Sequence, residues 1–283
     1  MNRTVGIIGA GTMGGGIAQV AALAGFEVFL YDVSGDALKN CMERIKKDLR
    51  ASMQKGTTTA PEATEALTRI RPRRAFNDMG AADLVIEAAV EDLAVKKEIF
   101  RALDQIVAPR AILATNTSSL SITSIGSLTK TPETVVGMHF FNPAVQMKLV
   151  EIVSGSRTSQ ETVRTAQETA LAMGKTPVFC SDTPGFIVNR VARPFYGEAL
   201  RMLGEGTATA EEIDRIARLS GGFRMGPFEL MDLIGIDVNY AVTKSIYEQY
   251  FQEPRYRPHP IQRRMVEAGT LGRKTGQGFY PYE

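Results

Sequence analysis

The chain has 283 residues, with 33 basic and 31 acidic side chains, a net charge of +2 and a hydrophobic fraction of 44%. This composition is typical of a globular protein, and it excludes a disordered chain, a collagen-like repeat and a strongly basic nucleic-acid binder. The length predicts two domains. Cys41 and Cys180 are the two cysteines and belong to no CxxC pair. They indicate a reducing, cytoplasmic environment rather than a disulfide framework or a thiolate zinc site.

The first part of the chain needs a decision about targeting. The stretch from Thr4 to Phe26 follows Arg3 and carries no charge. Repeated glycines interrupt it, which argues against a signal peptide or a membrane span. We therefore expect a soluble protein with no membrane partner, whose fold starts almost at Met1.

Short apolar runs then alternate with helix-length segments through the first half of the chain. Five of these runs are predicted strands: Val5–Ile8, Glu27–Tyr31, Leu84–Ala88, Ile112–Thr115 and Val135–Phe140. Such alternation is typical of βαβ units. It predicts an α/β Rossmann-type doubly wound sheet that is parallel and covered by helices on both faces.

The pattern becomes helical after about Ser181. Thr209 and Glu212 form a capping box ahead of a periodic apolar stretch, as at the start of a helix. The turn-rich segment 181–185, which contains Pro and Gly in sequence, marks the boundary. We predict a Rossmann-type α/β domain over 1–181 and an all-α C-terminal domain over 182–283.

A GxGxxG motif follows the first predicted strand and opens a helix, which is the context that a dinucleotide site requires. The motif supplies five candidate cofactor contacts: Gly9, Gly11, Thr12, Met13 and Gly14. Gly11 lets the backbone approach a pyrophosphate at the helix N-terminus. Asp32 ends the second strand, 21 residues after Gly11, where a carboxylate binds ribose hydroxyls and repels a 2′-phosphate. The pattern favours NAD over NADP; the alternative is a glycine-rich turn beside an unrelated surface Asp.

His139, one of two histidines, lies at the carboxyl end of a predicted strand, where open α/β sheets bind ligands. Glu151 lies inside the apolar run Leu149–Val153, where a carboxylate must pair or shift its pKa. A pair of these two would fix the imidazole tautomer and let the other ring nitrogen take a proton from an alcohol. The alternative is a structural histidine and an edge-strand glutamate.

Five other polar residues are candidates with a simpler alternative. Asn116 and Ser118 follow a strand at the same sheet edge, beside the cofactor, although such loops often serve as turns or helix caps. Asn189 begins the helical domain, where a lone Asn is usually solvated. Glu91 and Lys96 follow the third strand, and their simplest interpretation is a solvated helix face.

Two familiar kinds of site are missing from the sequence. It contains no HExxH, and its two histidines are 120 residues apart, so we predict no metal site. It also contains no GxSxG, which disfavours an α/β-hydrolase.

Together these residues resemble the L-3-hydroxyacyl-CoA dehydrogenase family, above all its short single-function bacterial members that act on 3-hydroxybutyryl-CoA. The resemblance spans nearly the whole chain and rests on Gly9–Gln19, Asn116–Leu120, Gly137–Pro143, Met147–Val153, Asp182–Arg190 and Lys274–Tyr280. It implies an NAD-binding Rossmann domain, an acyl-CoA substrate and a homodimer formed through the C-terminal domain.

The resemblance also implies roles for individual residues. Four positions keep the family's catalytic and substrate-contacting residues, namely His139, Glu151, Ser118 and Asn189. The family's NAD contacts fall on the glycine motif and on Asp32, Glu91, Lys96 and Asn116. For CoA the family uses a Ser and, seven residues later, a Lys. These positions are Asp48 and Lys55, so only Lys55 remains a candidate for a CoA contact.

Two other functions fit part of the same pattern. A sugar-acid dehydrogenase similar to the gulonate-oxidising enzymes carries the same Rossmann, His and Glu pattern. A non-catalytic NAD-binding sensor needs only the fold, although His139, Glu151, Ser118 and Asn189 together argue against it. Fatty-acid oxidation, butanoate metabolism and aromatic degradation all remain open as pathways.

Overall fold

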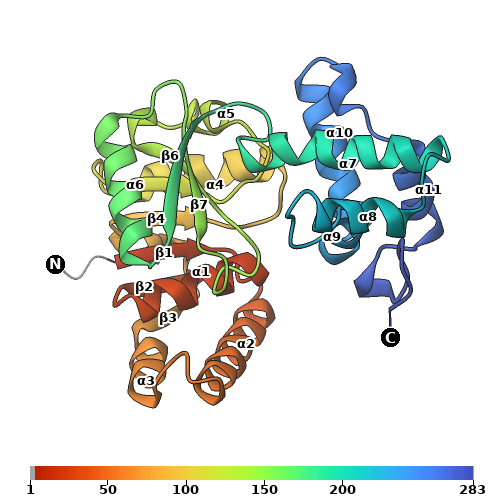
Figure 1. Ribbon diagram of the computed structural model, residues 1–283. Coiled ribbons are helices and arrows are strands. Elements are labelled where there is room, and N and C mark those ends of the chain that lie inside the picture. The colour runs from red at the N-terminus through yellow and green to blue at the C-terminus, as the bar shows by residue number, and fades with distance from the viewer. Residues whose placement is uncertain (1–3, 283) are drawn as a thin grey trace. The chain divides into compact units, whose positions relative to one another are not determined.

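The computed structural model describes residues 4–282, which form two compact units (Figure 1). The first unit ends at Thr183 and the second begins at Pro184, two residues beyond the boundary that the sequence predicts. The expected start of the fold at Met1 lies outside the described residues. Separate hydrophobic clusters lie in the two units, one around the sheet and one among the helices that follow it.

The first unit contains one eight-stranded sheet. Its strands are β1 (Thr4–Ile8), β2 (Glu27–Tyr31), β3 (Ile70–Arg73), β4 (Leu84–Glu87), β5 (Ile112–Thr115), β6 (Val135–Phe140), β7 (Leu149–Ser154) and β8 (Thr176–Ser181). They lie in the order β3-β2-β1-β4-β5-β6-β7-β8, and β1 to β6 pair in parallel. The chain winds outward from β1 in both directions, so the predicted doubly wound sheet is confirmed.

The far end of the sheet differs from the prediction. β7 pairs antiparallel with β6, and β8 pairs parallel with β7, so the expectation of a wholly parallel sheet is wrong here. The sequence also fails to predict β3 and β8, which stand at the two sheet edges. Each contains a proline, Pro72 or Pro177, and each exposes several side chains. Edge strands tolerate proline and lack the continuous apolar run of a central strand, so their hydrophobic signal is weak.

Helices cover both faces of this sheet (Figure 1). They are α1 (Thr12–Leu23), α2 (Gly35–Gln54), α3 (Ala60–Arg69), α4 (Leu93–Ile106), α5 (Ile122–Gly126) and α6 (Gln160–Ala172). Every residue of β4 and β5 is buried, as the double cover requires. Ile86 and Ala114 join the hydrophobic cluster that includes α1 and α6. Their neighbours Val85 and Leu113 are also buried and, by strand alternation, face the other side of the sheet.

The second unit is helical. Its helices are α7 (Val188–Gly204), α8 (Ala210–Leu219), α9 (Pro227–Ile234), α10 (Ile236–Gln249) and α11 (Pro260–Ala268), and no β-strand occurs in residues 184–282 beyond isolated bridges. The predicted capping box forms, because Thr209 and Glu212 hydrogen bond to each other's backbone at the start of α8. The prediction of an all-α C-terminal domain is therefore confirmed. None of the helices within residues 4–282 has both the length and the apolar character needed to cross a membrane.

Candidate active site

The loops that follow the parallel strands meet at one edge of the sheet, and hydrogen bonds connect them. The Gly9 N–H donates to the Tyr31 carbonyl at 2.8 Å, which joins the loop after β1 to the end of β2. The Asn116 N–H donates to the Glu87 carbonyl at 2.7 Å, which joins the loop after β5 to β4. The glycine motif, Asp32, Asn116 and His139 therefore share this carboxyl edge, where open α/β sheets bind ligands.

The glycine motif has the shape of a pyrophosphate cradle. Gly9 has φ +103°, and a Cβ on it would lie 2.5 Å from the Ala88 carbonyl oxygen. A Cβ on Gly14 would lie 1.8 Å from the Gly9 carbonyl oxygen, so only glycine lets α1 pack this closely on the turn. Beside Gly11 the space is open for 4 Å, and no described side chain caps α1. The uncapped first-turn N–H groups fit the diphosphate of NAD.

Asp32 is held in place at the end of β2. One carboxylate oxygen accepts the Ala10 N–H at 2.7 Å, and the other accepts the Ser34 N–H at 2.9 Å. Each oxygen keeps a second lone pair, which can accept from a ribose hydroxyl. This arrangement fits the adenosine ribose of NAD and disfavours a 2′-phosphate.

His139 and Glu151 form a buried pair. The two residues stand directly opposite each other in the antiparallel ladder of β6 and β7, so their side chains lie on one face. The distance between His139 Nδ1 and Glu151 Oε2 is 2.6 Å, and the residues are 6% and 1% exposed. A carboxylate only accepts, so Nδ1 is the donor, and Nε2 is the acceptor of the neutral ring. The structure thus brings together the two residues that the sequence proposes as an acid–base pair.

Glu91 organises the loop that carries Ser118. Its Oε1 accepts the Thr117 hydroxyl at 2.6 Å and the Ser118 N–H at 2.8 Å, and the Ser118 hydroxyl lies 3.2 Å away. Burial raises the pKa of Glu91, but the charge of Lys96 and the hydrogen bonds from Thr117 and Ser118 outweigh it and leave the pKa below its ordinary value. Glu91 is therefore an anion that fixes the position of Ser118.

Lys96 is buried, so the interpretation as a solvated helix face is wrong for this residue. Its side chain is 1% exposed, and Nζ lies 2.7 Å from Glu87 Oε1 and 3.3 Å from Glu91 Oε2. Glu87 is itself fully buried on β4 and accepts the Thr115 hydroxyl at 2.7 Å. Sequence reasoning missed Glu87, although it shows the same signal as Glu151, an acid within an apolar run. Direct contacts of Glu91 and Lys96 with NAD stay predictions.

Asn116 connects the two strands beside the pair. Its side-chain oxygen accepts the Phe140 N–H at 2.9 Å, which joins the end of β5 to the end of β6, next to His139. The ring of Phe141 lies against His139 with a centroid separation of 4.4 Å. Asn116 therefore supports the strand that carries the histidine, and its contact with NAD remains a prediction.

Two predicted residues lie away from this edge or in the other unit. Asn189 stands in the first turn of α7, in the second unit, and its role stays a prediction. Lys55 is the exposed C-cap residue of α2. Among residues 4–282, no three or more His, Cys, Asp or Glu side chains gather as metal ligands would.

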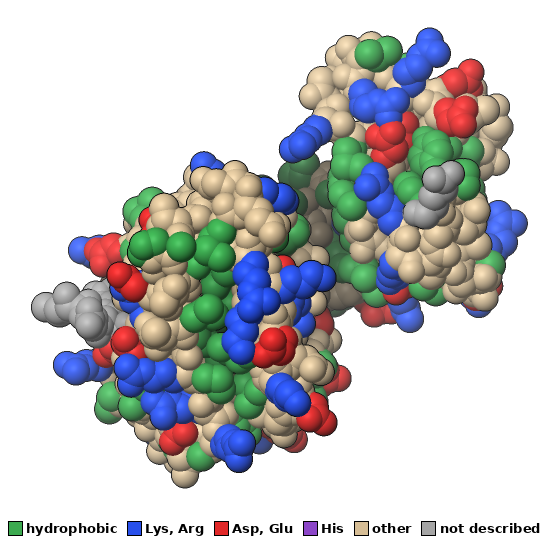
Figure 2. Space-filling view, turned by 90° about the horizontal axis from the view of Figure 1, so that it is seen from below, with side chains coloured by type: hydrophobic (Ala, Val, Ile, Leu, Met, Phe, Trp, Pro, Cys, Tyr) green, Lys and Arg blue, Asp and Glu red, His purple; other side chains and the backbone are tan. Residues whose placement is uncertain are grey.

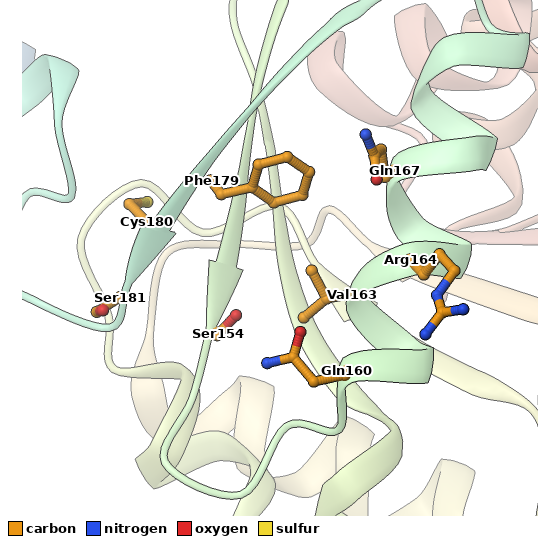
Figure 3. Close-up of a pocket in the computed structure, with 8 residues that line it drawn as sticks. All are labelled: Ser154, Gln160, Val163, Arg164, Gln167, Phe179, Cys180 and Ser181. Atoms are coloured by element: carbon orange, nitrogen blue, oxygen red, sulfur yellow. The ribbon is translucent and has the colours of Figure 1, made fainter.

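A surface groove between α6 and the β7–β8 edge lies elsewhere in the first unit (Figure 3). It is lined by Ser154, Gln160, Val163, Arg164, Gln167, Phe179, Cys180 and Ser181. Val153, beside Ser154, pairs with Gly137 of β6, so the groove lies toward the end of the sheet away from His139. Burial and then the charges of Glu151 and Asp182 raise the pKa of Cys180 to about 12, so its thiol stays protonated. The groove carries no part of the candidate site.

Comparisons with known proteins show the family to which the chain is similar. The 3-hydroxyacyl-CoA dehydrogenase NAD binding domain matches residues 4–183, and the C-terminal domain of the same family matches residues 185–282. A 3-hydroxyadipyl-CoA dehydrogenase of Escherichia coli is 50% identical over 280 residues, which cover 99% of this chain but 59% of that protein. The chain thus spans about three fifths of the length of this relative.

Two further relatives match over all or nearly all of their length. A 3-hydroxybutyryl-CoA dehydrogenase of Clostridioides difficile is 43% identical over 276 residues, 98% of each chain. The crystal structure of an (S)-3-hydroxybutyryl-CoA dehydrogenase from Ralstonia eutropha is 42% identical, covers 100% of both chains and superposes with a TM-score of 0.96.

Proposed function

The chain belongs to the 3-hydroxyacyl-CoA dehydrogenase family, and we propose that it oxidises a short 3-hydroxyacyl-CoA, such as 3-hydroxybutyryl-CoA, to the 3-oxoacyl-CoA with NAD. One observation carries the proposal: the buried His139–Glu151 pair lies at the same sheet edge as the glycine motif and Asp32. The names of the C. difficile and R. eutropha relatives support the substrate.

The proposed mechanism assigns each residue a task. NAD, when bound, would supply the acceptor for the hydride that leaves the carbon carrying the hydroxyl. His139 takes the hydroxyl proton at Nε2, while Glu151 accepts Nδ1–H and stabilises the imidazolium that forms. Ser118, on the loop that Glu91 holds, and Asn189 of the second unit hold the substrate oxygen or the imidazole in register. In the reverse direction His139 returns the proton.

We propose that CoA binds to basic side chains on α2. Figure 2 shows Lys and Arg side chains gathered on the underside of the first unit, where α2 and α3 lie. Lys55 is exposed at the end of α2, and an ammonium there can pair with a CoA phosphate. Lys55→Ala should raise the KM for acetoacetyl-CoA without changing the KM for NADH; an unchanged KM for acetoacetyl-CoA would contradict the contact.

We further propose a homodimer formed through the second unit. Apolar side chains on α7, α8 and the segment after α8 are exposed, among them Val191 at 69%, Leu219 at 77% and Phe223 at 52%. Such a concentration of exposed apolar surface is typical of an interface. Sedimentation should give the mass of two chains for the wild type and of one for Leu219→Glu. A single-chain mass for the wild type would contradict the dimer.

The two cysteine thiols support a cytoplasmic location. Cys41 and Cys180 are both free, and burial raises the pKa of each thiol. Free thiols are typical of proteins that work in a reducing compartment. Fractionation of cells that express the protein checks this proposal, and recovery in an oxidising compartment would contradict it.

Initial rates test the function itself. We expect rapid NADH oxidation with acetoacetyl-CoA, much slower oxidation of NADPH, and no NAD reduction with gulonate. In the oxidative direction, 3-hydroxybutyryl-CoA and 3-hydroxyadipyl-CoA should be compared, because the E. coli relative is named for the latter. Activity confined to gulonate would make the protein a sugar-acid dehydrogenase. Binding of NADH without any turnover would make it a sensor.

A further inference from the structure

Arg44 of α2 contacts the glycine motif from the side, and the motif itself does not reveal it. Its Nη2 donates to the Ala10 carbonyl at 3.1 Å and to the Gly11 carbonyl at 2.9 Å. Asp32 holds the same turn through the Ala10 N–H at 2.7 Å. Three consecutive peptide groups at the start of the cradle are therefore fixed, the first by a carboxylate and the next two by a guanidinium.

These contacts set the direction of the N–H groups that follow. In a planar trans peptide, the carbonyl and the next N–H point in opposite directions. The Ala10 carbonyl points toward Arg44, so the Gly11 N–H points away from Arg44. The Gly11 carbonyl also points toward Arg44, so the Thr12 N–H points away from it as well. These N–H groups open the uncapped end of α1, the place that fits a diphosphate.

Gly15 gives a second, independent observation. It lies just beyond the GxGxxG motif, so the dinucleotide pattern does not require glycine there, and glycine is a poor helix former. A Cβ on Gly15 would lie 2.9 Å from Arg44 Nη2 and 2.7 Å from Cys41 Sγ. The absence of a side chain at this position leaves the space that the guanidinium fills.

We propose that Arg44 is a positioning residue of the NAD site, which aligns the Gly11 and Thr12 N–H groups with the diphosphate, and that Gly15 makes room for it. The guanidinium also adds a positive charge beside the cradle. This inference deepens the proposed function and rests on its NAD site. It concerns how tightly the diphosphate is held rather than the hydride and proton steps.

Binding measurements with and without the diphosphate test the inference. Arg44→Met should weaken NADH and ADP-ribose binding about tenfold, or about 1.4 kcal/mol. Adenosine, measured as a competitor, should bind as before, and kcat at saturating NADH should stay close to that of the wild type. A merely structural role would weaken all three ligands alike. The matched control Arg50→Met removes the same charge from an exposed position of α2 and should leave NADH affinity unchanged.

The outcomes separate the inference from the function on which it rests. Wild-type protein that binds no NADH would overturn the proposed function. NADH binding by Arg44→Met as tight as the wild type's, an equal loss for adenosine, or an equal loss in Arg50→Met would overturn only the role of Arg44.

A lysine variant and a double-mutant cycle complete the test. Arg44→Lys keeps the charge but loses the rigid fork of donors, so its NADH affinity should lie between those of the wild type and Arg44→Met. Full recovery of NADH affinity in Arg44→Lys would show that the positive charge alone strengthens binding, without the positioning of N–H groups. Gly15→Ala should weaken NADH binding in the wild type, where the new Cβ would clash with both Arg44 and Cys41. In the Arg44→Met background only the clash with Cys41 remains from this pair, so the same substitution should weaken NADH binding less. Strict additivity would contradict the link between Gly15 and Arg44.

Discussion

Both units bury carboxylates, but the partners of those carboxylates differ. In the first unit, Glu87 faces the ammonium of Lys96, and Glu151 faces the imidazole of His139. In the second unit, Asp232 accepts the backbone N–H groups of Phe279 and Tyr280, each at 3.0 Å. The first arrangement couples a carboxylate to a basic side chain, whereas the second connects it to backbone N–H groups and to the Tyr282 hydroxyl, which donates to Asp232 Oδ2 at 2.9 Å.

The carboxylates of the second unit hold the end of the chain. Asp214 accepts the N–H groups of Phe228 and Glu229 in the first turn of α9, each at 2.9 Å, and the Tyr280 hydroxyl at 2.8 Å. A Cβ on Gly278 would lie 2.1 Å from Asp232 Oδ1, so that position needs glycine. A buried acid is thus no sign of catalysis by itself. The nature of its partner matters, because a backbone N–H, or a tyrosine hydroxyl such as that of Tyr280 whose pKa burial and Asp214 raise, does not take up the proton of a substrate as an imidazole does.

Glu151→Gln should produce the largest effect on activity. The amide cannot stabilise an imidazolium, so turnover should fall about 10²–10⁴-fold, the usual contribution of acid–base catalysis. NADH affinity should change little, because the glycine motif and Asp32 are untouched. Stopped-flow rates and a fluorescence titration of NADH measure the two quantities. Turnover equal to that of the wild type would show that the pair is not an acid–base pair.

Glu87→Gln tests the other pair of the first unit. It removes the charge opposite a buried ammonium, which should lower the free energy of unfolding by about 3–5 kcal/mol. The double variant Glu87→Gln/Lys96→Met removes both charges and should recover most of that loss. Urea unfolding of the two variants and the wild type gives the comparison. A single variant as stable as the wild type would mean that Glu91 alone satisfies Lys96.

Asp232→Asn makes the matched change in the second unit. Its amide group replaces a carboxylate oxygen that accepts an N–H, so the free energy of unfolding should fall by about 1–3 kcal/mol. Turnover per folded molecule should remain unchanged at temperatures well below Tm. Calorimetry and initial rates on one preparation check both statements. A fall in turnover without a change in Tm would remove the distinction between the two units.

Glu91 should give the smallest effect, and the pH dependence of that effect should appear only in acid. Its pKa is lowered in the folded state, so its stabilising contribution is complete above the unfolded-state pKa of about 4.3 and disappears as the pH falls through the folded-state value. The stability difference between the wild type and Glu91→Gln should therefore be constant near neutral pH and shrink below about pH 4.3. Urea unfolding at several pH values measures it. A difference that grows in acid would contradict the lowered pKa.

The sequence predicts those parts of the site that require a distinctive pattern of residues. Glycines at fixed spacing and an acid inside an apolar run indicate the cradle and Glu151, because few other structures explain such residues. Lys96 and Arg44 are different, since a charged residue on an amphipathic helix usually lies in solvent. The burial of Lys96 and the contacts of Arg44 depend on which strand end each helix crosses, and that is a tertiary fact. The antiparallel β7 is also unpredictable from alternation, because both directions bury the same side chains.

The register of β6 and β7 limits how this region can change over evolution. Side chains alternate between the two faces of a sheet, so a one-residue slip would place Ile152 or Val150 opposite His139 and send Glu151 to the other face. An insertion or deletion between the two residues must be absorbed entirely in the segment 141–148 that joins the strands. We therefore expect that relatives that keep the pair vary in length between these two residues only within that segment.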